Sequence, residues 1–425
     1  MNFSLKEGDY GPNVEQLQSI LKKIGFYDGK VDSKFGPLTK DAVLRFQKEF
    51  GLTPDGFVGK NTLNRLIPYI NGYTYYIVQP GDTLYNIALK YNTNVNSILF
   101  ANQNLDADNL QIGEAIIVPF GEIVKTDISY TYNFMKSNLE SLKIIYPFLQ
   151  IGIIGRSVLN RPIPYVKIGR GKKQILYNSS IHANEWITAS LTMKFIENFS
   201  KRYVKDEKIF GYKARSLFEQ CSLYIIPMMN PDGVDLVTGY FKENDEVYNQ
   251  AKKISQNYEE IPFPSGWKAN IKGVDLNLQF PANWEEARNI KYEEGFSTPA
   301  PRDYVGIAPI SQPEAVALYN FTTNNKFNLT ISFHSQGKVI YWRYLDYLPE
   351  GSFEIAQEFS RVSGYELDDT PFRSSFAGYR DWFIQDFNKP GFTIEVGEGE
   401  NPLPISQFNE IYSDIEGIFV LGMVM

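Results

Sequence analysis

Histidine is scarce in this chain, and the two copies present can share one metal ion with a nearby glutamate. The 425 residues contain two histidines, His182 and His334, and Glu185 follows the first of them in H-A-N-E. Imidazole nitrogens and a carboxylate oxygen suit zinc, and a catalytic zinc takes three protein ligands while one position stays open for water. The residues therefore predict one zinc ion per chain, bound by His182, Glu185 and His334.

The elements expected around these ligands are strands that end where the ligands begin. A strand-prone run, Gln174–Tyr177, precedes His182, and an amphipathic helical pattern follows at Trp186–Phe199. A second apolar run, Leu329–Phe333, ends directly at His334. An H-x-x-E pattern alone is equally typical of a surface histidine beside a helix-start glutamate. The scarcity of histidine favours the metal site.

A third strand-like run places an acid in an apolar setting. Gly391–Val396 reads G-F-T-I-E-V and contains Glu395. One interpretation is a strand-end glutamate paired with a lysine or an arginine. The other is a general base that takes a proton from water activated by the zinc ion.

Two further motifs connect these positions to a known family. They are M-N-P-D-G at Met229–Gly233 and G-V-D-L-N at Gly273–Asn277. With the four residues above, in this order, they make residues 125–425 resemble the zinc carboxypeptidase family. The resemblance implies an α/β fold in which helices flank a mixed sheet and the metal lies at strand ends. It also implies these roles: His182, Glu185 and His334 as ligands, Glu395 as base, and Asp275 as the carboxylate that orients the His182 ring.

The chain departs from this family at two positions that handle the substrate. Asn277 is retained as a substrate-binding residue, but Leu278 follows it where the family has an arginine for the substrate's free α-carboxylate. A free carboxyl terminus at the cleaved residue is therefore not expected to be required. Lys268 stands where the family has the arginine that stabilises the oxyanion, and it keeps the charge without the fork geometry. The alternative for Lys268 is an ordinary solvated lysine.

The stretch S-S-F-A-G-Y-R-D-W, Ser374–Trp382, indicates a recognition residue. In the family, the residue before the aspartate of G-x-x-D-W lies at the floor of the pocket for the side chain that leaves with the amine. Here that residue is Arg380. A buried guanidinium would select a carboxylate. The alternative is an Arg380 paired on the surface with Asp381 or Asp386, and Arg373 is then the next candidate for recognition.

Composition and charge restrict the classes of function. A net charge of −7 argues against nucleic acid as a partner, and 43% hydrophobic residues are typical of a globular chain. No run of about 18 apolar residues predicts a transmembrane segment. The N-terminus lacks the pattern of an export signal. The single Cys221 is expected to be a small buried residue.

Residues 1–70 contain a near-repeat. Two helical patterns, Val14–Ile24 and Leu38–Phe50, are each preceded by aromatic-Gly-Pro and followed by an Asp-Gly turn, at Asp28 and at Asp55. The pattern predicts a small all-α domain of three helices whose apolar positions form a core. It resembles the peptidoglycan-binding module that accompanies cell-wall hydrolases.

Residues 74–120 predict a compact βααβ unit. A short strand and a Gly-Asp turn lead into helical patterns at Leu84–Tyr91 and Val95–Asn102, and an apolar strand closes the unit. The pattern resembles the LysM domain, which implies binding of glycans that contain N-acetylglucosamine. Asp82 and Thr83 are candidates for glycan contact and for capping of the helix, and the two roles are compatible.

From residue 125 to residue 425, helices and apolar strands alternate as an α/β sheet requires. Two segments break this pattern. Thr238–Gly266, rich in Asn, Glu, Tyr and Pro, predicts a long loop that could wall the cleft. The charged stretch Trp284–Gly295 predicts a solvated face. The expected order is thus a three-helix domain at 1–70, a LysM domain at 74–120 and a peptidase domain at 125–425.

The three parts together imply one substrate, the peptide stem of bacterial peptidoglycan, with Leu278 implying cleavage inside the stem. The stretch N-L-Q-F-P-A-N-W, Asn277–Trp284, further resembles the γ-D-glutamyl-L-diamino acid endopeptidase group of spore-forming bacteria. That group cuts between D-glutamate and meso-diaminopimelate, which implies a link to sporulation. Because no export signal is visible, we expect the bacterial cytoplasm or the forespore, with association with the cell wall after release. Two alternatives stay open. One is a carboxypeptidase for free C-termini, if another arginine binds the carboxylate, and the other is a wall-binding protein without catalysis, which the complete ligand set disfavours.

Overall fold

The computed structural model describes residues 4–425, and the chain separates into two compact units. The first unit holds the residues through 129 together with 133–149 and 200–207. The second unit holds 130–132, 150–199 and 208–425. The domain boundaries expected between 70 and 74 and between 120 and 125 stay a prediction.

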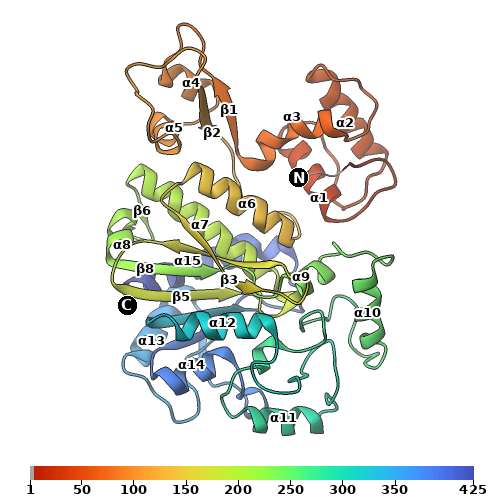
Figure 1. The fold of residues 1–425 in the computed structure, drawn as a ribbon, viewed down its shortest axis with the longest axis vertical. Coiled ribbons are helices and arrows are strands. Elements are labelled where there is room, and N and C mark those ends of the chain that lie inside the picture. The colour runs from red at the N-terminus through yellow and green to blue at the C-terminus, as the bar shows by residue number, and fades with distance from the viewer. Residues whose placement is uncertain (1–3) are drawn as a thin grey trace. The chain divides into compact units, whose positions relative to one another are not determined.

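The first unit begins with a helical module, drawn in red to orange in Figure 1. Its helices are α1 (Pro12–Lys23), α2 (Pro37–Glu49) and α3 (Lys60–Asn71). The first two begin with proline, whose missing N–H costs no hydrogen bond at the first helical position. Apolar side chains at helical spacing meet in one interior, among them Val14, Leu17, Leu21, Val43, Phe46 and Leu66. The prediction of three helices is confirmed.

Two buried glutamines show how the halves of this helical module correspond. Gln18 donates from Nε2 to Asp32 Oδ1 at 2.8 Å, and Gln47 donates in the same way to Asp55 Oδ1 at 2.7 Å. Asp32 is therefore the structural counterpart of Asp55. The sequence pattern paired Asp55 with Asp28 instead, and that pairing is wrong because Asp28 lies beside Arg45 while Asp32 accepts from the buried glutamine.

The second module of this unit is the expected βααβ unit. Its elements in chain order are β1 (Tyr73–Ile77), α4 (Leu84–Lys90), α5 (Val95–Ala101) and β2 (Ala115–Pro119). The two strands pair antiparallel. Asn102 joins the end of the second helix to the closing strand, because its Nδ2 donates to the Ile117 carbonyl at 2.8 Å and its Oδ1 accepts from the Ile117 N–H at 2.9 Å. Most of α6 (Tyr132–Ile145) also belongs to this unit.

The second unit is built on an eight-stranded mixed sheet. Its strands are β3 (Gln150–Arg156), β4 (Pro162–Ile168), β5 (Lys173–Ser179), β8 (Cys221–Ile226), β9 (Phe327–His334), β10 (Val339–Tyr341), β11 (Glu366–Asp368) and β12 (Gly391–Glu395). They lie in the order β11-β10-β12-β9-β5-β8-β4-β3. The four central strands, β12, β9, β5 and β8, are parallel, so their carboxyl ends meet at one edge. The expected mixed α/β fold is confirmed.

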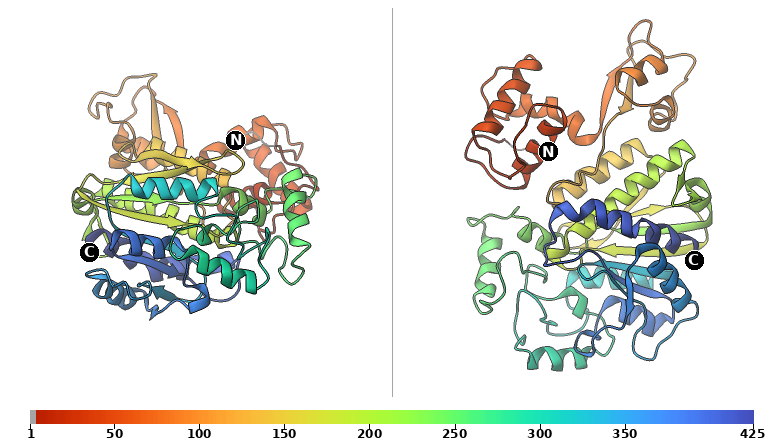
Figure 2. Two further views of the ribbon diagram at one scale, coloured as in Figure 1. Left: turned by 60° about the horizontal axis from the view of Figure 1, so that its bottom comes forward. Right: turned by 180° about the vertical axis from the view of Figure 1, so that it is seen from behind.

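Helices cover both faces of this sheet. On one face lie α7 (Ile187–Lys205) and α15 (Phe408–Val424), where the rings of Phe195 and Phe419 stack with centroids 4.5 Å apart. Figure 2 shows these two helices side by side from behind. On the other face lie α12 (Pro313–Thr323) and α14 (Tyr379–Phe387), where Tyr319 stacks on Trp382 at 4.6 Å. The remaining elements are β6 (Lys208–Ile209), β7 (Tyr212–Lys213), α8 (Ala214–Gln220), α9 (Pro231–Val237), α10 (Glu246–Ser255), α11 (Trp284–Glu293) and α13 (Ser352–Ser363).

Two expectations about this unit are wrong. The segment 238–266 is not a bare loop, because it contains α10, and Phe263 packs edge-on against the buried ring of Trp267 at 6.0 Å. The stretch 284–295 is not merely a solvated face, because α11 buries Trp284 and Ile290 in the core. Among the described residues, no helix combines the length and apolar character needed to cross a membrane.

Candidate metal centre and active site

The residues predicted to bind zinc and to act as base meet at the carboxyl ends of the central parallel strands. His182 follows β5 after a short turn, His334 is the last residue of β9, and Glu395 is the last residue of β12. Glu395 and His334 are register partners on neighbouring strands. A turn of 3₁₀ helix, Ala183–Glu185, brings Glu185 back toward His182. Carboxyl ends of parallel strands in α/β sheets are where ligands typically bind.

Three ligand atoms converge in a geometry that fits a tetrahedral metal. His182 Nδ1 lies 2.9 Å from Glu185 Oε1, His334 Nδ1 lies 3.0 Å from Glu185 Oε2, and the two Nδ1 atoms are 3.2 Å apart. Ligands about 2.0–2.1 Å from a tetrahedral zinc are separated by about 3.3 Å, so the set matches such an ion closely. All three side chains are buried. A cation at the centre would satisfy two imidazole nitrogens that otherwise compete for one carboxylate.

Asp275 holds the other side of the His182 ring, as the resemblance implied. Its Oδ1 lies 3.2 Å from His182 Nε2, which leaves Nδ1 facing the ligand cluster. Burial alone would lower the pKa of His182, but the carboxylates of Glu185 and Asp275 outweigh burial and raise it to about 9. For Glu185, burial opposes ionisation, yet the charges of His182 and Lys268 hold its pKa well below the usual range. The cluster therefore favours an ionised Glu185, the form that binds metal.

His334 lacks the support that His182 receives. Its Nε2 is buried and makes no hydrogen bond with any described residue. The neighbouring backbone is held instead, because Ser335 Oγ donates to Asn401 Oδ1 at 2.8 Å and the Ser335 N–H donates to Glu185 Oε2 at 3.3 Å. The ring of His334 is thus positioned by its strand and by the ligand cluster.

Glu395 lines the same pocket, and its carboxylate is free. It is partly exposed, and no described residue donates a hydrogen bond to it. Burial raises the pKa of Glu395, and the charge of His334 opposes this rise. The interpretation of Glu395 as a strand-end acid paired with a lysine or an arginine finds no such pair in the described structure. An unpaired carboxylate next to the ligand cluster is suited to proton transfer.

Lys268 reaches the ligand cluster, so it is not an ordinary solvated lysine. Its Nζ lies 3.2 Å from Glu185 Oε1, and its side chain is 19% exposed. Burial would lower the pKa of Lys268, but the Glu185 carboxylate raises it above the usual range. A permanent cation therefore stands beside the ligand cluster, where an oxyanion would need stabilisation.

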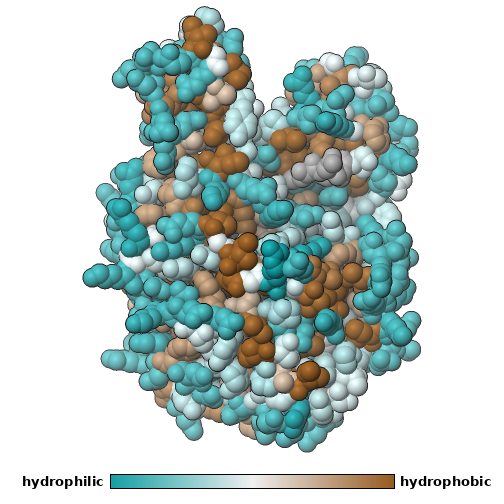
Figure 3. Space-filling model, viewed as in Figure 1, coloured by the Kyte–Doolittle hydropathy of each residue, from teal (hydrophilic) through white to brown (hydrophobic). Residues whose placement is uncertain are grey.

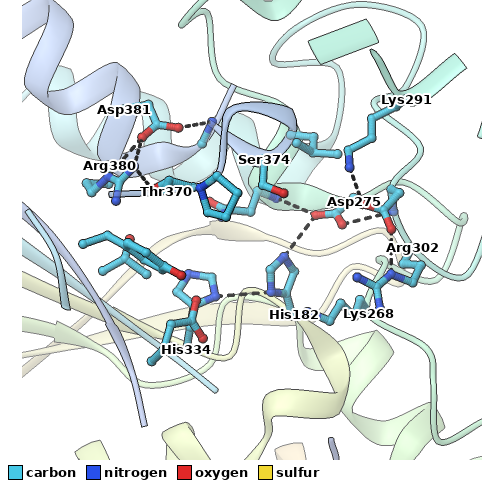
Figure 4. A pocket seen from close by; sticks show the side chains of 18 residues that line it. His182, Lys268, Asp275, Lys291, Arg302, His334, Thr370, Ser374, Arg380 and Asp381 are labelled. Carbon is cyan, nitrogen blue, oxygen red and sulfur yellow. Dashed lines mark hydrogen bonds and ion pairs between the residues drawn. The ribbon is translucent and has the colours of Figure 1, made fainter. Parts of the chain in front are cut away.

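The pocket around this cluster has a volume of about 280 Å³. Figure 4 shows its two ends, with Arg380 and Asp381 at one and Lys268 and Arg302 at the other, and with the two histidines between them. Charged and polar residues dominate the lining, which comprises His182, Lys268, Asp275, Asn277, Lys291, Arg302, Asp303, His334, Tyr341, Thr370, Ser374, Arg380, Asp381, Thr393 and Glu395, with Leu278, Pro371 and Gly378. Such a pocket fits a substrate that carries several charges.

Asn277 and Leu278 lie in the pocket wall next to the residue that orients His182. The Asn277 N–H donates to Asp275 Oδ1 at 3.1 Å, and Asn277 Oδ1 accepts from the Tyr379 N–H at 3.1 Å. Its Nδ2 makes no hydrogen bond with a described residue. Leu278, where the family has an arginine, presents an apolar side chain to the pocket.

The two arginines singled out in the sequence have different surroundings. Arg380 is buried and lines the pocket, where it is paired with Asp381 and donates from Nη2 to Thr370 Oγ1 at 2.9 Å. The pairing with Asp381 is thus real, but it lies in the pocket and not on the surface. Arg373 lies outside the pocket lining, is 54% exposed and pairs with Glu294 at 2.7 Å.

Lys291, Arg302 and Tyr341 are among the pocket residues that the sequence did not indicate. Lys291 comes from α11, and its Nζ lies 3.0 Å from Asp303 Oδ1. Tyr341 ends β10, next to β12 in the sheet, and the Arg380 guanidinium lies 5.8 Å from its ring centre. Arg302 stands in an irregular loop, so no local pattern marks it. A buried stripe on α11, which contains Trp284, Ala287, Ile290 and Lys291, could have revealed that this helix faces inward.

The residues proposed for glycan contact are engaged within their own module. Asp82 Oδ2 accepts from Tyr76 Oη at 2.8 Å and from the Gln79 N–H at 2.7 Å, and Thr83 Oγ1 accepts from the Asn86 N–H at 3.1 Å as the cap of α4. Figure 3 shows apolar side chains at the surface of this module. The exposed ones are Tyr75, Ile77, Tyr85, Leu89 and Ile112. Glycan contact by Asp82 and Thr83 stays a prediction.

Comparison with known proteins agrees with this geometry. Residues 135–415 match the zinc carboxypeptidase family, residues 10–66 a peptidoglycan binding domain and residues 76–119 the LysM domain. The chain is 46% identical over 307 residues to gamma-D-glutamyl-L-diamino acid endopeptidase 1 of Lysinibacillus sphaericus, which covers 71% of this chain and 74% of that protein. It is 38% identical over 292 residues to the uncharacterized protein YqgT of Bacillus subtilis (strain 168), which covers 68% of this chain and 76% of that protein.

Solved structures share the fold at low identity. Thrombin activatable fibrinolysis inhibitor superposes with a TM-score of 0.56 at 18% identity, covering 83% of this chain and 97% of that chain. The His-Glu-His set fits zinc, the metal of the matched family. The chain therefore belongs to the zinc carboxypeptidase family, as a metallopeptidase that also carries a peptidoglycan binding domain and a LysM domain.

Proposed function

We propose that the chain is a zinc-dependent endopeptidase that hydrolyses the bond between the γ-carboxyl of D-glutamate and meso-diaminopimelate in peptidoglycan stem peptides. The observation that carries this proposal is Leu278 in the pocket wall, where carboxypeptidases of the family have an arginine. A leucine cannot pair with a carboxylate, so the pocket does not demand a free carboxyl terminus at the cleaved residue. The name of the relative at 46% identity supports the choice of bond.

The pocket residues have separate roles in this reaction. Zinc held by the His-Glu-His set would supply Lewis-acid activation of the attacking water and of the scissile carbonyl. Glu395, whose carboxylate is free, takes the proton of the attacking water and returns it to the leaving amine. Lys268 holds a positive charge beside the carbonyl oxygen as negative charge develops there. Asp275 fixes the His182 ring.

Arg380 is proposed to recognise the diamino acid that leaves. Diaminopimelate carries a carboxylate on its D-centre, several bonds from the scissile amide. The Arg380 guanidinium uses Nε and Nη2 for Asp381 and Thr370, and its Nη1 makes no hydrogen bond with a described residue. A carboxylate can accept from such a partly engaged guanidinium by a charge-assisted bond.

The two modules of the first unit are proposed to bring the enzyme to the polymer. Binding to peptidoglycan and to glycans with N-acetylglucosamine would raise the local concentration of the peptidase at its substrate. Asp82 and Thr83 are the proposed glycan contacts. The matched modules support action at the cell wall. A role in sporulation and an origin in the cytoplasm or the forespore are further parts of the proposal.

Mass spectrometry of the products from L-Ala-γ-D-Glu-meso-diaminopimelate, with and without a terminal D-Ala, tests the activity. The zinc-loaded protein should release L-Ala-D-Glu from both peptides, because the bond cut is the same in each. On the peptide that ends in D-Ala, release of D-Ala alone would identify a carboxypeptidase for free C-termini, whereas on the peptide without D-Ala both activities cut the same bond. The absence of any product would identify a wall-binding protein without catalysis.

A further inference from the structure

Arg302 lines the active-site pocket at the end where Lys268 lies, and none of the roles above uses it. Hydrogen bonds join the loop that contains Arg302 to two residues of the active site. The Lys268 N–H donates to the Pro301 carbonyl at 2.8 Å, and the Asp303 N–H donates to Asp275 Oδ2 at 3.2 Å. Arg302 therefore stands between one contact to the proposed oxyanion lysine and one to the carboxylate that orients His182.

The position of the Arg302 side chain is fixed by Asp303. Asp303 has φ 64°, a left-handed conformation that is uncommon for a residue other than glycine. In this conformation its Oδ2 accepts from Arg302 Nε at 2.6 Å, while its Oδ1 lies 3.0 Å from Lys291 Nζ. One carboxylate thus holds two cations of the pocket wall.

The donors at the tip of Arg302 are unused. Nη1 and Nη2 make no hydrogen bond with any described residue, and the side chain is 43% exposed. Lys291 differs, because it is 9% exposed and its ammonium lies within 3.0 Å of both Asp303 and Glu294. A guanidinium with two free parallel donors is a receptor for a carboxylate.

We propose that Arg302 determines specificity by binding the free α-carboxylate of the D-glutamyl residue on the acyl side of the scissile bond. This inference rests on the proposed function. In a γ-linked D-glutamyl residue, four single bonds separate the carbon of that carboxylate from the scissile carbonyl carbon, a reach of at most about 5 Å. A glutamyl residue linked through its α-carboxyl carries its γ-carboxylate at the same bond separation, so Arg302 selects an acidic residue on the acyl side and not the linkage itself.

The two ends of the pocket then bind the residues on the two sides of the scissile bond. Lys268 marks the end where the carbonyl oxygen lies, so the acyl residue extends toward Arg302. The diamino acid extends to the opposite end, toward Arg380. Each cation is held by a neighbouring aspartate, Asp303 or Asp381, so each presents its remaining donors in a fixed direction.

Two matched peptides test the role of Arg302. One is L-Ala-γ-D-Glu-meso-diaminopimelate, and the other carries D-isoglutamine, in which an amide replaces the α-carboxylate. The unsubstituted zinc-loaded protein should prefer the acid. Arg302→Gln should lower kcat/KM for the acid about 10- to 100-fold, the effect of losing charge-assisted hydrogen bonds, and should lower it far less for the amide. Arg302→Lys should keep part of the preference.

The ratio of kcat/KM for the two peptides separates recognition from structure. Arg288→Gln serves as a matched control, because Arg288 pairs with Glu285 and lies outside the pocket lining, and its ratio should equal that of the unsubstituted protein. Equal losses on acid and amide in Arg302→Gln would overturn the inference and leave Arg302 a structural residue. An unsubstituted protein that cleaves both peptides equally would overturn it too, while the proposed function would stand. Failure to cut the γ-bond in either peptide would overturn both.

Discussion

Glu395 and Glu314 are glutamates of the same unit, and burial raises the pKa of both carboxyls, Glu314 to about 7. Their hydrogen bonds differ. Glu314, which is fully buried, accepts from the Val158 N–H at 3.0 Å and from Asn270 Nδ2 at 3.3 Å. Glu395 accepts from no described residue and faces the pocket. A raised pKa therefore indicates a candidate functional acid only where its oxygens remain available.

The same distinction applies to other polar groups of the molecule. At the pocket, Nη1 and Nη2 of Arg302 and Nδ2 of Asn277 make no hydrogen bond with described residues. In the LysM module, Asp82 and Thr83 accept hydrogen bonds that shape their own turn. We expect substitutions in the first group to change catalysis and those in the second to change stability first.

The largest effect is expected from His334→Ala, which removes one of the three ligands. Zinc content should fall from about one ion per chain to near zero, and hydrolysis should stop, because two ligands hold zinc poorly. Metal analysis after dialysis, together with peptide hydrolysis, measures both. A chelator should abolish the activity of the unsubstituted protein, and added zinc should restore it. Full metal content and turnover in His334→Ala would show that the metal lies elsewhere.

Glu395→Gln and Glu314→Gln form a matched pair that compares a carboxylate with free oxygens and a hydrogen-bonded one. Glu395→Gln should keep zinc and lower kcat by on the order of 10²–10⁴ or more, because a proton-transfer group is lost. Glu314→Gln should leave kcat near that of the unsubstituted protein. Steady-state hydrolysis at pH 7 gives both values. Near-normal turnover by Glu395→Gln would remove this residue from the mechanism.

Arg380→Ala should reduce kcat/KM for diaminopimelate stems. The loss of transition-state stabilisation should be roughly 2–4 kcal/mol, the range for losing one partner of a desolvated ion pair. The loss should be much smaller for stems with lysine, which lack the second carboxylate. Arg373→Ala is the control, because that residue is exposed and pairs with Glu294 outside the pocket. Equal losses on both stems would mean that Arg380 serves only to neutralise Asp381.

Glu314 also predicts a pH dependence of stability. Its pKa is raised from 4.5 to about 7 in the folded protein, so the folded state binds more protons than the unfolded state between these values. Its contribution to stability is then lost as pH rises from about 4.5 to about 7, by up to about 3 kcal/mol. Glu314→Gln should lack this loss. Urea unfolding of both proteins over this pH range measures the difference, from which effects of zinc release cancel. Parallel curves of unfolding free energy against pH for the two proteins would contradict the raised pKa of Glu314.

The metal ligands could be predicted from the sequence because local patterns mark them. Two histidines at strand ends, with a glutamate one turn after the first, leave few alternatives. Arg302 could not be predicted, because its position depends on hydrogen bonds between a loop that has no periodic pattern and the residues Lys268, which donates, and Asp275, which accepts. The pairing of Arg380 with Asp381 was one of two alternatives, and only the structure shows that this pair lies in the pocket.

Two parts of the fold were misjudged for related reasons. In α11, charged residues hid a buried stripe of Trp284, Ala287 and Ile290, which are spaced for one helix face. In the helical module, matching Asp-Gly pairs suggested a repeat that the buried glutamines Gln18 and Gln47 correct. In both cases the prediction relied on the types of residue present, whereas burial depends on how the residues are spaced along the chain.

The smallest effect is expected in the LysM module, where capping and glycan contact coincide at Thr83. Thr83→Asn keeps an oxygen that can accept from the Asn86 N–H, so the cap of α4 and the thermal stability of the module should be unchanged. The substitution removes the hydroxyl. If that hydroxyl contacts glycan, affinity for N-acetylglucosamine oligomers should fall about two- to tenfold, the effect of one neutral hydrogen bond. Calorimetric titration of the full chain measures the affinity, and Thr83→Ala serves as the control that loses both the cap and the hydroxyl. Unchanged affinity in Thr83→Asn would leave Thr83 a structural residue and would move the search for glycan contacts to the exposed Tyr85 and Ile112.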